Sequence, residues 1–489
     1  MNSDDITDIG QAGILVLLGT LLSMFSGFLF RLIGARFLTA DQFGLVVLGI
    51  TIVNIASIPC ILGLNQGIVK FLSDKDNTHN RNSYITVSLL TTLIAGLFVA
   101  FLGIAVNDII QKFLFEGMNS NSFLYIILLT IPVFALFQLL SGILRGAMDS
   151  RGFVNISKVC KPATQLGFTG LAIYLFGTSV SVAGAFFASI FISVSFGLYL
   201  VWNHGWRPEI DRSLQYSTLF QFSLPLLISS SVFILLSHVD KLLIGYYINS
   251  SGVAIYEVTV TIASLLGLFR SSFGFLLYPK LSEKLSMGKE SAIRNMYTQT
   301  TKWIILLSTP AFAILVTRPH ILVELFGSQY DVNDVRLPLV LLSSGLFLNA
   351  IVGPNGEALL GFGHSKKVLF YNLVSVFINI ILNIILIPRF GLNGAAAASL
   401  IGYTVMNFGK SIDLYINHAI PVLSIKPVIT SLLTFVLCIF LVYLLPATSL
   451  MIEFALLSSV GFLSLVAGVG VLWIVGGLSE ADRELIPKI

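Results

Sequence analysis

Apolar stretches of membrane-spanning length follow one another almost without interruption along this chain. A helix rises about 1.5 Å per residue, so about 20 apolar residues cross the hydrocarbon core of a bilayer, which is about 30 Å thick. Of the 489 residues, 56% are hydrophobic and only 11% are charged. A soluble globular protein of this length could not keep that much apolar surface out of water. We therefore predict an all-α integral membrane protein that crosses the membrane many times.

Fourteen stretches can be marked as membrane spans, and no connection between them is long enough for a folded domain. They lie near residues 11–33, 43–66, 83–106, 122–144, 154–176, 181–202, 218–243, 253–277, 297–317, 337–360, 367–387, 393–416, 427–446 and 451–475. Acidic residues precede the first stretch where a signal peptide would carry basic ones, so we expect this stretch to be retained.

The sequence also repeats itself after about 210 residues. Three groups of residues recur in the same order, with offsets of 215, 210 and 211. They are Leu144, Gly146, Ser150 and Arg151, matching Leu359, Gly361, Ser365 and Lys366; Gly184, Ala185, Ala188 and Ser189, matching Gly394, Ala395, Ala398 and Ser399; and Ile33 and Gly34, matching Ile244 and Gly245. Coincidence is the alternative, since small residues recur easily in membrane proteins.

This repeat predicts two six-helix lobes related by pseudo-two-fold symmetry, residues 1–212 and 213–420, followed by two further helices and a cytoplasmic tail in residues 421–489. A duplicated helix bundle is the usual scaffold of transporters whose halves rock against each other.

Positive charge is distributed unevenly between the two sides of the expected membrane. Twenty of the 28 lysines and arginines fall in segments that are cytoplasmic if the amino terminus is inside. The positive-inside rule therefore predicts that both termini are cytoplasmic. The six histidines are scattered, and no phosphate-loop or zinc-protease motif is present. We expect no catalytic site, no metal, no cofactor and no nucleic-acid partner.

A few charged side chains lie inside or at the ends of the apolar stretches. An ionised group at mid-bilayer costs at least about 2.5–3.5 kcal/mol, so such groups should face protein or water. Arg270 lies within the eighth stretch, although snorkelling to the lipid headgroups is an alternative for it. Arg31 shares a helical face with Ser23 and Gly27. Lys241 lies at the equivalent end of the first span of the second lobe.

Acidic residues near these cations are candidates for lining the same space or for ion coupling. Asp240 lies beside Lys241, and an ordinary ion pair between them is one interpretation. Glu257 opens the eighth stretch, and 13 residues at about 100° each place it about 140° from Arg270 around a continuous helix. The two could then not both point into one cavity, and the sequence leaves open which does. Arg36 is a further cationic candidate, although it lies close to a loop.

Two polar positions complete the candidates. Glu357 lies in the tenth stretch beside Pro354, and we expect the helix to break there, as is tolerated where a helix lines protein or water. Asn54 shares a helical face with Thr51 and is a candidate for the lumen, with an interhelical hydrogen bond as the alternative.

Together these features resemble the multidrug/oligosaccharidyl-lipid/polysaccharide exporter superfamily, in particular its polysaccharide-transport branch. The residues that carry the resemblance are 31–38, 42–45, 222–226, 240–245 and 253–256. The resemblance covers roughly residues 10–475. It implies a V-shaped pair of six-helix lobes around a central cavity that opens alternately to the two faces of the cell membrane.

Membership implies a flippase that moves a polyprenyl-diphosphate-linked oligosaccharide from the cytoplasmic to the outer leaflet. The glycan would then pass to a polymerase or to oligosaccharyltransferase machinery. Because a diphosphate is anionic, we expect Arg31, Arg270 and Lys241, with Arg36, to form a cationic lumen that binds it. The lipid tail would stay among membrane lipids, and we expect a monomer.

Two other functions are alternatives. A cation-coupled antiporter of the multidrug and toxin extrusion type needs an acidic residue that binds a proton or sodium. The first stretch contains none, so that interpretation depends on Glu257 and Glu357. A membrane glycosyltransferase would need a substantial extramembrane domain, which the short connections do not provide.

Overall fold

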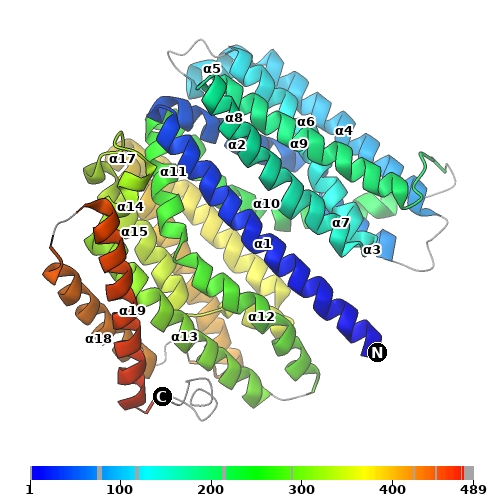
Figure 1. Ribbon diagram of the computed structural model, residues 1–489. Helices are drawn as coiled ribbons and strands as arrows, with labels where there is room; N and C mark the ends of the chain where they lie inside the picture. The colour runs from blue at the N-terminus through cyan, green and yellow to red at the C-terminus, as the bar shows by residue number, and fades with distance from the viewer. Residues whose placement is uncertain are drawn as a thin grey trace. The chain divides into compact units, whose positions relative to one another are not determined.

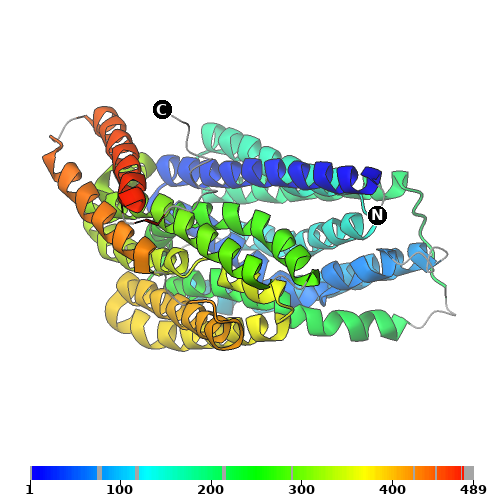
Figure 2. The same cartoon turned by 90° about the horizontal axis from the view of Figure 1, so that it is seen from below.

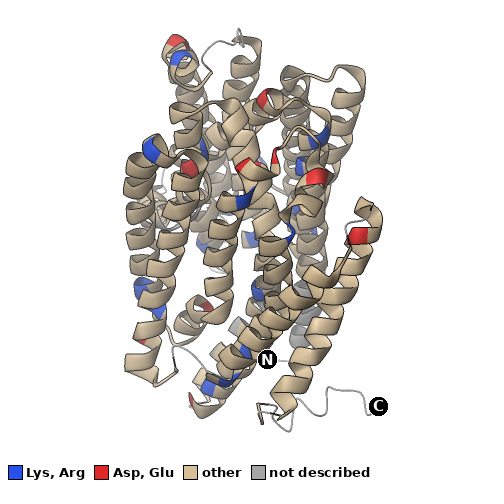
Figure 3. Cartoon of the chain, turned by 90° about the vertical axis from the view of Figure 1, so that its left-hand side faces the viewer, with Lys and Arg blue, Asp and Glu red and all other residues tan. Residues whose placement is uncertain are grey.

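The computed structural model describes residues 3–73, 80–115, 121–211, 216–287, 290–421, 425–446, 449–474 and 476–477. Across these residues every regular element is a helix, which confirms the expected all-α class (Figure 1). Charged residues are sparse along the lengths of the helices (Figure 3). Contacts divide the chain into two compact units, Met1–Glu257 and Val258–Ile489, called unit 1 and unit 2 below.

Unit 1 is a bundle in which α6 packs against α4 and α9, and α9 packs on α8 (Figure 1). Helix α10 packs on α2 and α3. The elements are α1 (Ser3–Phe37), α2 (Ala40–Ile61), α3 (Leu64–Ser73), α4 (Arg81–Ala105), α5 (Asn107–Leu114), α6 (Asn121–Gly146), α7 (Ser150–Val154), a π-helical turn (Asn155–Cys160), α8 (Lys161–Leu175), α9 (Ser179–Asn203), α10 (Tyr216–Tyr247) and the first part of α11 (Ser250–Ser264).

Unit 2 begins within α11, and in it α17 packs against α15 and α13 packs against α12 and α15. The two last helices, α18 and α19, lie side by side and pack on α13 (Figure 2). The elements are α12 (Gly267–Ser286), α13 (Glu290–Thr317), α14 (Pro319–Phe326), α15 (Val332–Ile351), α16 (Asn355–Gly361), α17 (Ser365–His418), α18 (Ile425–Leu444) and α19 (Leu450–Ile474).

Ten of the described helices are long and apolar enough to cross a membrane, or eleven if the bent pair of α11 and the start of α12 is one span. The chain is therefore a multi-pass membrane protein. One of the ten, the 54-residue α17, contains two of the expected stretches. The total of fourteen spans stays a prediction, and the expected cytoplasmic tail from residue 478 lies outside the described residues.

Helix ends recur at the spacing of the sequence repeat. Helices α1 and α10 end at residues 37 and 247, and α2 and α11 begin at residues 40 and 250, both 210 apart. Helices α6 and α16 end at residues 146 and 361, and α7 and α17 begin at residues 150 and 365, both 215 apart. The lobe boundary near residue 212 stays a prediction, because the compact units divide at Glu257 instead and α10 packs within unit 1.

Two breaks in unit 2 have local causes. Helix α15 ends at Ile351 and α16 begins at Asn355, which confirms the break expected at Pro354. Within α17, Gly391 has φ 56° and ψ −134°, a backbone conformation open essentially to glycine. Helix α17 is therefore two helices joined at Gly391.

Candidate functional site

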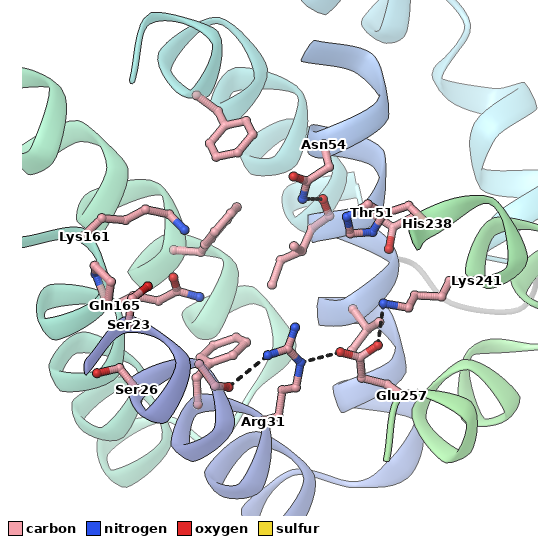
Figure 4. Close-up of a pocket in the computed structure, with 17 residues that line it drawn as sticks. Ser23, Ser26, Arg31, Thr51, Asn54, Lys161, Gln165, His238, Lys241 and Glu257 are labelled. Carbon is pink, nitrogen blue, oxygen red and sulfur yellow. Dashed lines mark hydrogen bonds and ion pairs between the residues drawn. The ribbon is translucent and has the colours of Figure 1, made fainter. Parts of the chain in front are cut away.

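A polar cavity of about 270 Å³ lies within unit 1 (Figure 4). Its charged lining residues are Arg31, Lys161, Lys241 and Glu257, which come from α1, α8, α10 and α11. Three cations and one carboxylate leave a formal excess of two positive charges. The polar lining is completed by Ser23, Ser26, Thr51, Asn54, Gln165 and His238. Such a charge excess among predominantly apolar helices favours an anionic ligand.

Glu257 binds two of these cations at once. Its Oε1 accepts a hydrogen bond from Arg31 Nε at 2.6 Å, and its Oε2 lies 2.7 Å from Lys241 Nζ. The side chains of Glu257 and Lys241 are 5% and 7% exposed, whereas that of Arg31 is 41% exposed. Because buried charges are tolerated only when they are paired, the carboxylate stabilises both cations while the guanidinium stays open to the cavity.

The start of α11 is fixed against the start of α2, and this positions Glu257 two turns farther along. A Cβ atom on Gly44 would lie 1.8 Å from the carbonyl oxygen of Ser250, so only glycine allows this approach. The Ser250 hydroxyl donates a hydrogen bond to Asp41 Oδ1 at 2.9 Å. Close backbone packing and one polar contact therefore hold α11 where its carboxylate reaches the cavity.

On α1, the face predicted from helical spacing is the face that lines the cavity. Ser23, Gly27 and Arg31 all belong to the lining. Arg31 Nη1 also donates to the Gly27 carbonyl oxygen at 3.2 Å, one turn earlier on the same helix. This bond restrains the guanidinium along α1, between Gly27 and Glu257 (Figure 4).

Lys161 enters the cavity at a widened point of its helix. The π-helical turn Asn155–Cys160 leads directly into it, and Pro162 follows. Proline has no N–H to donate four residues back, which accounts for the local widening. Lys161 Nζ lies about 6 Å from the ring centres of Phe134, Phe137 and Phe186. In the part of the chain that the structure describes, no hydrogen bond or ion pair reaches this ammonium.

Sequence reasoning missed four of the polar or charged lining residues, Ser26, Lys161, Gln165 and His238. Lys161 is one of the twenty cations that the count by segments places on the cytoplasmic side. Its position inside the stretch 154–176 is the signal that could have identified it.

An ion pair between Lys241 and Asp240, one of the two interpretations of their adjacency, does not form. Lys241 Nζ pairs with Glu257, whereas Asp240 Oδ1 accepts the backbone N–H of Lys241 at 2.8 Å. Consecutive residues on a helix point about 100° apart, so neighbours in sequence do not face each other. Asp240 is itself buried, at 7% exposure, and is not part of the lining.

The remaining candidates of unit 1 differ in position. Asn54 and Thr51 both line the cavity, and Asn54 Nδ2 donates to the Ile50 carbonyl oxygen at 2.8 Å. Arg36 is exposed in the last turn of α1 and is not part of the lining. A role for either residue in binding stays a prediction.

Arg270 and Glu357 form a separate ion pair in unit 2. Arg270 Nη2 lies 2.8 Å from Glu357 Oε2, with side chains 23% and 26% exposed. Lys410 is 6% exposed, and its Nζ approaches α16 beside this pair, 3.7 Å from where a Cβ on Gly356 would lie. A second, buried cation of unit 2 therefore lies near the Arg270–Glu357 pair.

The predicted separation of Glu257 and Arg270 by 140° around one helix is wrong. Helix α11 ends at Ser264, and the chain bends by 51° before α12. The angular separation assumed a continuous helix, so it does not decide which side chain faces a cavity. Glu257 lines the cavity of unit 1.

Comparison with known proteins identifies a family. The family model described as "Polysaccharide biosynthesis protein" matches residues 33–335. A protein of Shigella flexneri named "Putative O-antigen transporter" is 26% identical over 370 residues, which cover 74% of this chain and 87% of that protein. A protein of Haloferax volcanii named "Probable low-salt glycan biosynthesis flippase Agl15" is 24% identical over 393 residues, with coverage of 80% and 79%.

A solved structure titled "Lipid II flippase MurJ, inward closed conformation" has the same fold. It superimposes with a TM-score of 0.76 over 94% of this chain and 99% of that chain, at 15% sequence identity. These three similar proteins are named as a transporter and as flippases.

Proposed function

Because the chain belongs to the polysaccharide biosynthesis protein family, in the polysaccharide-transport branch of the multidrug/oligosaccharidyl-lipid/polysaccharide exporters, we propose that it flips a polyprenyl-diphosphate-linked oligosaccharide. The chain is a membrane transporter of this superfamily. The direction we propose is from the cytoplasmic to the outer leaflet of the cell membrane, by alternating access, with both termini cytoplasmic. A glycan polymerase or an oligosaccharyltransferase would use the product.

The choice of substrate class rests on one observation, the excess of positive charge in the cavity of unit 1. A diphosphate must lose part of its hydration to enter a membrane-spanning bundle. The cavity supplies positive charge that offsets this loss, because its three cations, Arg31, Lys161 and Lys241, outnumber its one carboxylate, Glu257. Cation-to-phosphate hydrogen bonds are also among the stronger polar contacts in proteins. An uncharged or cationic cargo would gain nothing from the excess of positive charge.

The antiporter alternative has less support. It requires a carboxylate that can bind a proton or sodium. Both oxygens of Glu257 are already engaged by cations, and Glu357 is paired with Arg270. A coupling ion would therefore have to displace a cation at Glu257, or bind beside Arg270 at Glu357.

The proposal can be tested in proteoliposomes that carry a radiolabelled polyprenyl diphosphate in both leaflets. A phosphatase added outside hydrolyses only headgroups in the outer leaflet. In empty liposomes the phosphatase should release phosphate only from lipid in the outer leaflet. In liposomes that contain the chain, we expect it to release phosphate from nearly all of the lipid. Release equal to that of empty liposomes, together with drug resistance on expression in a pump-deficient host, would favour the antiporter.

A further inference from the structure

Glu257 is a carboxylate of the cavity lining that already pairs with two of the three cations there. Resting on the proposed function, we infer that Glu257 is an exchangeable counter-ion. It occupies Arg31 and Lys241 while the cavity is empty, and the substrate's diphosphate displaces it. Lys161, which has no carboxylate partner among the described residues, is the first cation to receive the incoming group.

The geometry leaves a route for this exchange. Glu257 contacts Arg31 through Nε, and Gly27 accepts from Nη1. A guanidinium has five N–H donors, so further donors remain on a side chain that is 41% exposed. An anion can therefore contact Arg31 before the carboxylate leaves. Lys161 faces the same cavity from α8 (Figure 4).

The energetics favour exchange over simple addition. Lys241 is 7% exposed, and a buried cation without an anion is strongly unfavourable. Glu257 keeps the empty cavity stable, and a diphosphate that replaces it keeps the cations paired. When the substrate leaves, the returning carboxylate takes its place. Release then costs less than it would if it left the cations unpaired, which helps a carrier let its cargo go.

Two opposite effects on binding and transport follow. Without the competing carboxylate, the diphosphate should bind more tightly and leave more slowly. Without the ammonium of Lys161, it should bind more weakly. A purely structural role for Glu257 would instead weaken binding, because the cations would lose their positions.

Binding of farnesyl diphosphate to the purified full-length chain in detergent tests the inference. We expect Glu257→Gln to bind this probe about tenfold more tightly than the wild type, and Lys161→Met about tenfold more weakly. Glu257→Gln should nevertheless export less glycan in cells, and Glu257→Asp should restore part of that export. Glu324→Gln and Lys112→Met make the same charge changes at exposed positions, so both should bind like the wild type.

If the wild type binds the probe and Glu257→Gln binds it no more tightly, the exchange is overturned. The proposed function is not affected by that result. If Glu257→Gln does not fold, Glu257→Asp takes its place, since a carboxylate shortened by one methylene should compete less and bind the probe more tightly than the wild type does. Lack of binding by the wild type would overturn the proposed function and this inference together.

Discussion

The double substitution Arg31→Gln and Lys161→Met should reduce glycan export at least about a hundredfold in cells that depend on this chain. Hydrogen bonds to charged groups contribute about 1.5–3 kcal/mol each, and about 1.4 kcal/mol corresponds to a factor of ten. The pair of changes removes the formal excess of two positive charges from the cavity. Export is measured as the amount of surface glycan per cell, compared at equal abundance of the two proteins.

These two substitutions leave no buried charge without a partner. Glu257 keeps its partner Lys241 at 2.7 Å, so the variant should fold and reach the membrane. Lys112→Met with Arg389→Gln removes the same two charge types at exposed positions and should export normally. Full export by the Arg31 and Lys161 variant would show that the cationic cavity does not bind the cargo.

The substitution Arg318→Gln should lower the melting temperature of the purified chain by roughly 5–10 °C, because breaking a buried ion pair costs about 3–5 kcal/mol. Arg318 Nη1 lies 2.9 Å from Glu453 Oε1, and Glu453 is only 5% exposed. Arg318 Nη2 also donates to the carbonyl oxygens of Val442 and Leu445, at 3.2 and 3.3 Å. One guanidinium therefore joins the start of α14 to α18 and α19.

Part of this loss should be recovered when the carboxylate is removed as well. In Arg318→Gln combined with Glu453→Gln, no unpaired charge stays buried, and the two changes should cost less together than the sum of each alone. Arg336→Gln removes an exposed arginine from the same unit and should leave the melting temperature unchanged. An Arg318→Gln chain as stable as the wild type would contradict this role.

The fold class and most helix positions could be predicted because the length of an apolar stretch decides whether it can cross a membrane. The break at Pro354 was predictable for a local reason, since proline cannot continue the hydrogen bonding of the preceding turn. The end of α11 at Ser264 was not, because no proline stands there and the stretch reads as one apolar run. That bend is why the angle between Glu257 and Arg270 was predicted wrongly.

The site was only partly predictable. Arg31 and Lys241 could be chosen because a charge in an apolar helix requires a partner or water. Glu257 could also be chosen, but its pairing with both cations could not be predicted, since tertiary packing brings its helix near them. Lys161 was not predicted as a cavity residue, because counting charges by segment treats every lysine near a loop as solvated. Whether these residues bind cargo stays a prediction.

Affinity for a charged headgroup, measured apart from transport, tests the cationic cavity most directly. The purified chain should bind farnesyl diphosphate at least about a hundredfold more tightly than farnesol, which has the same tail and no charge. The Arg31→Gln and Lys161→Met variant should lose most of that difference. Equal affinity for the two probes, or an unchanged difference in the variant, would contradict an anion-binding cavity in unit 1.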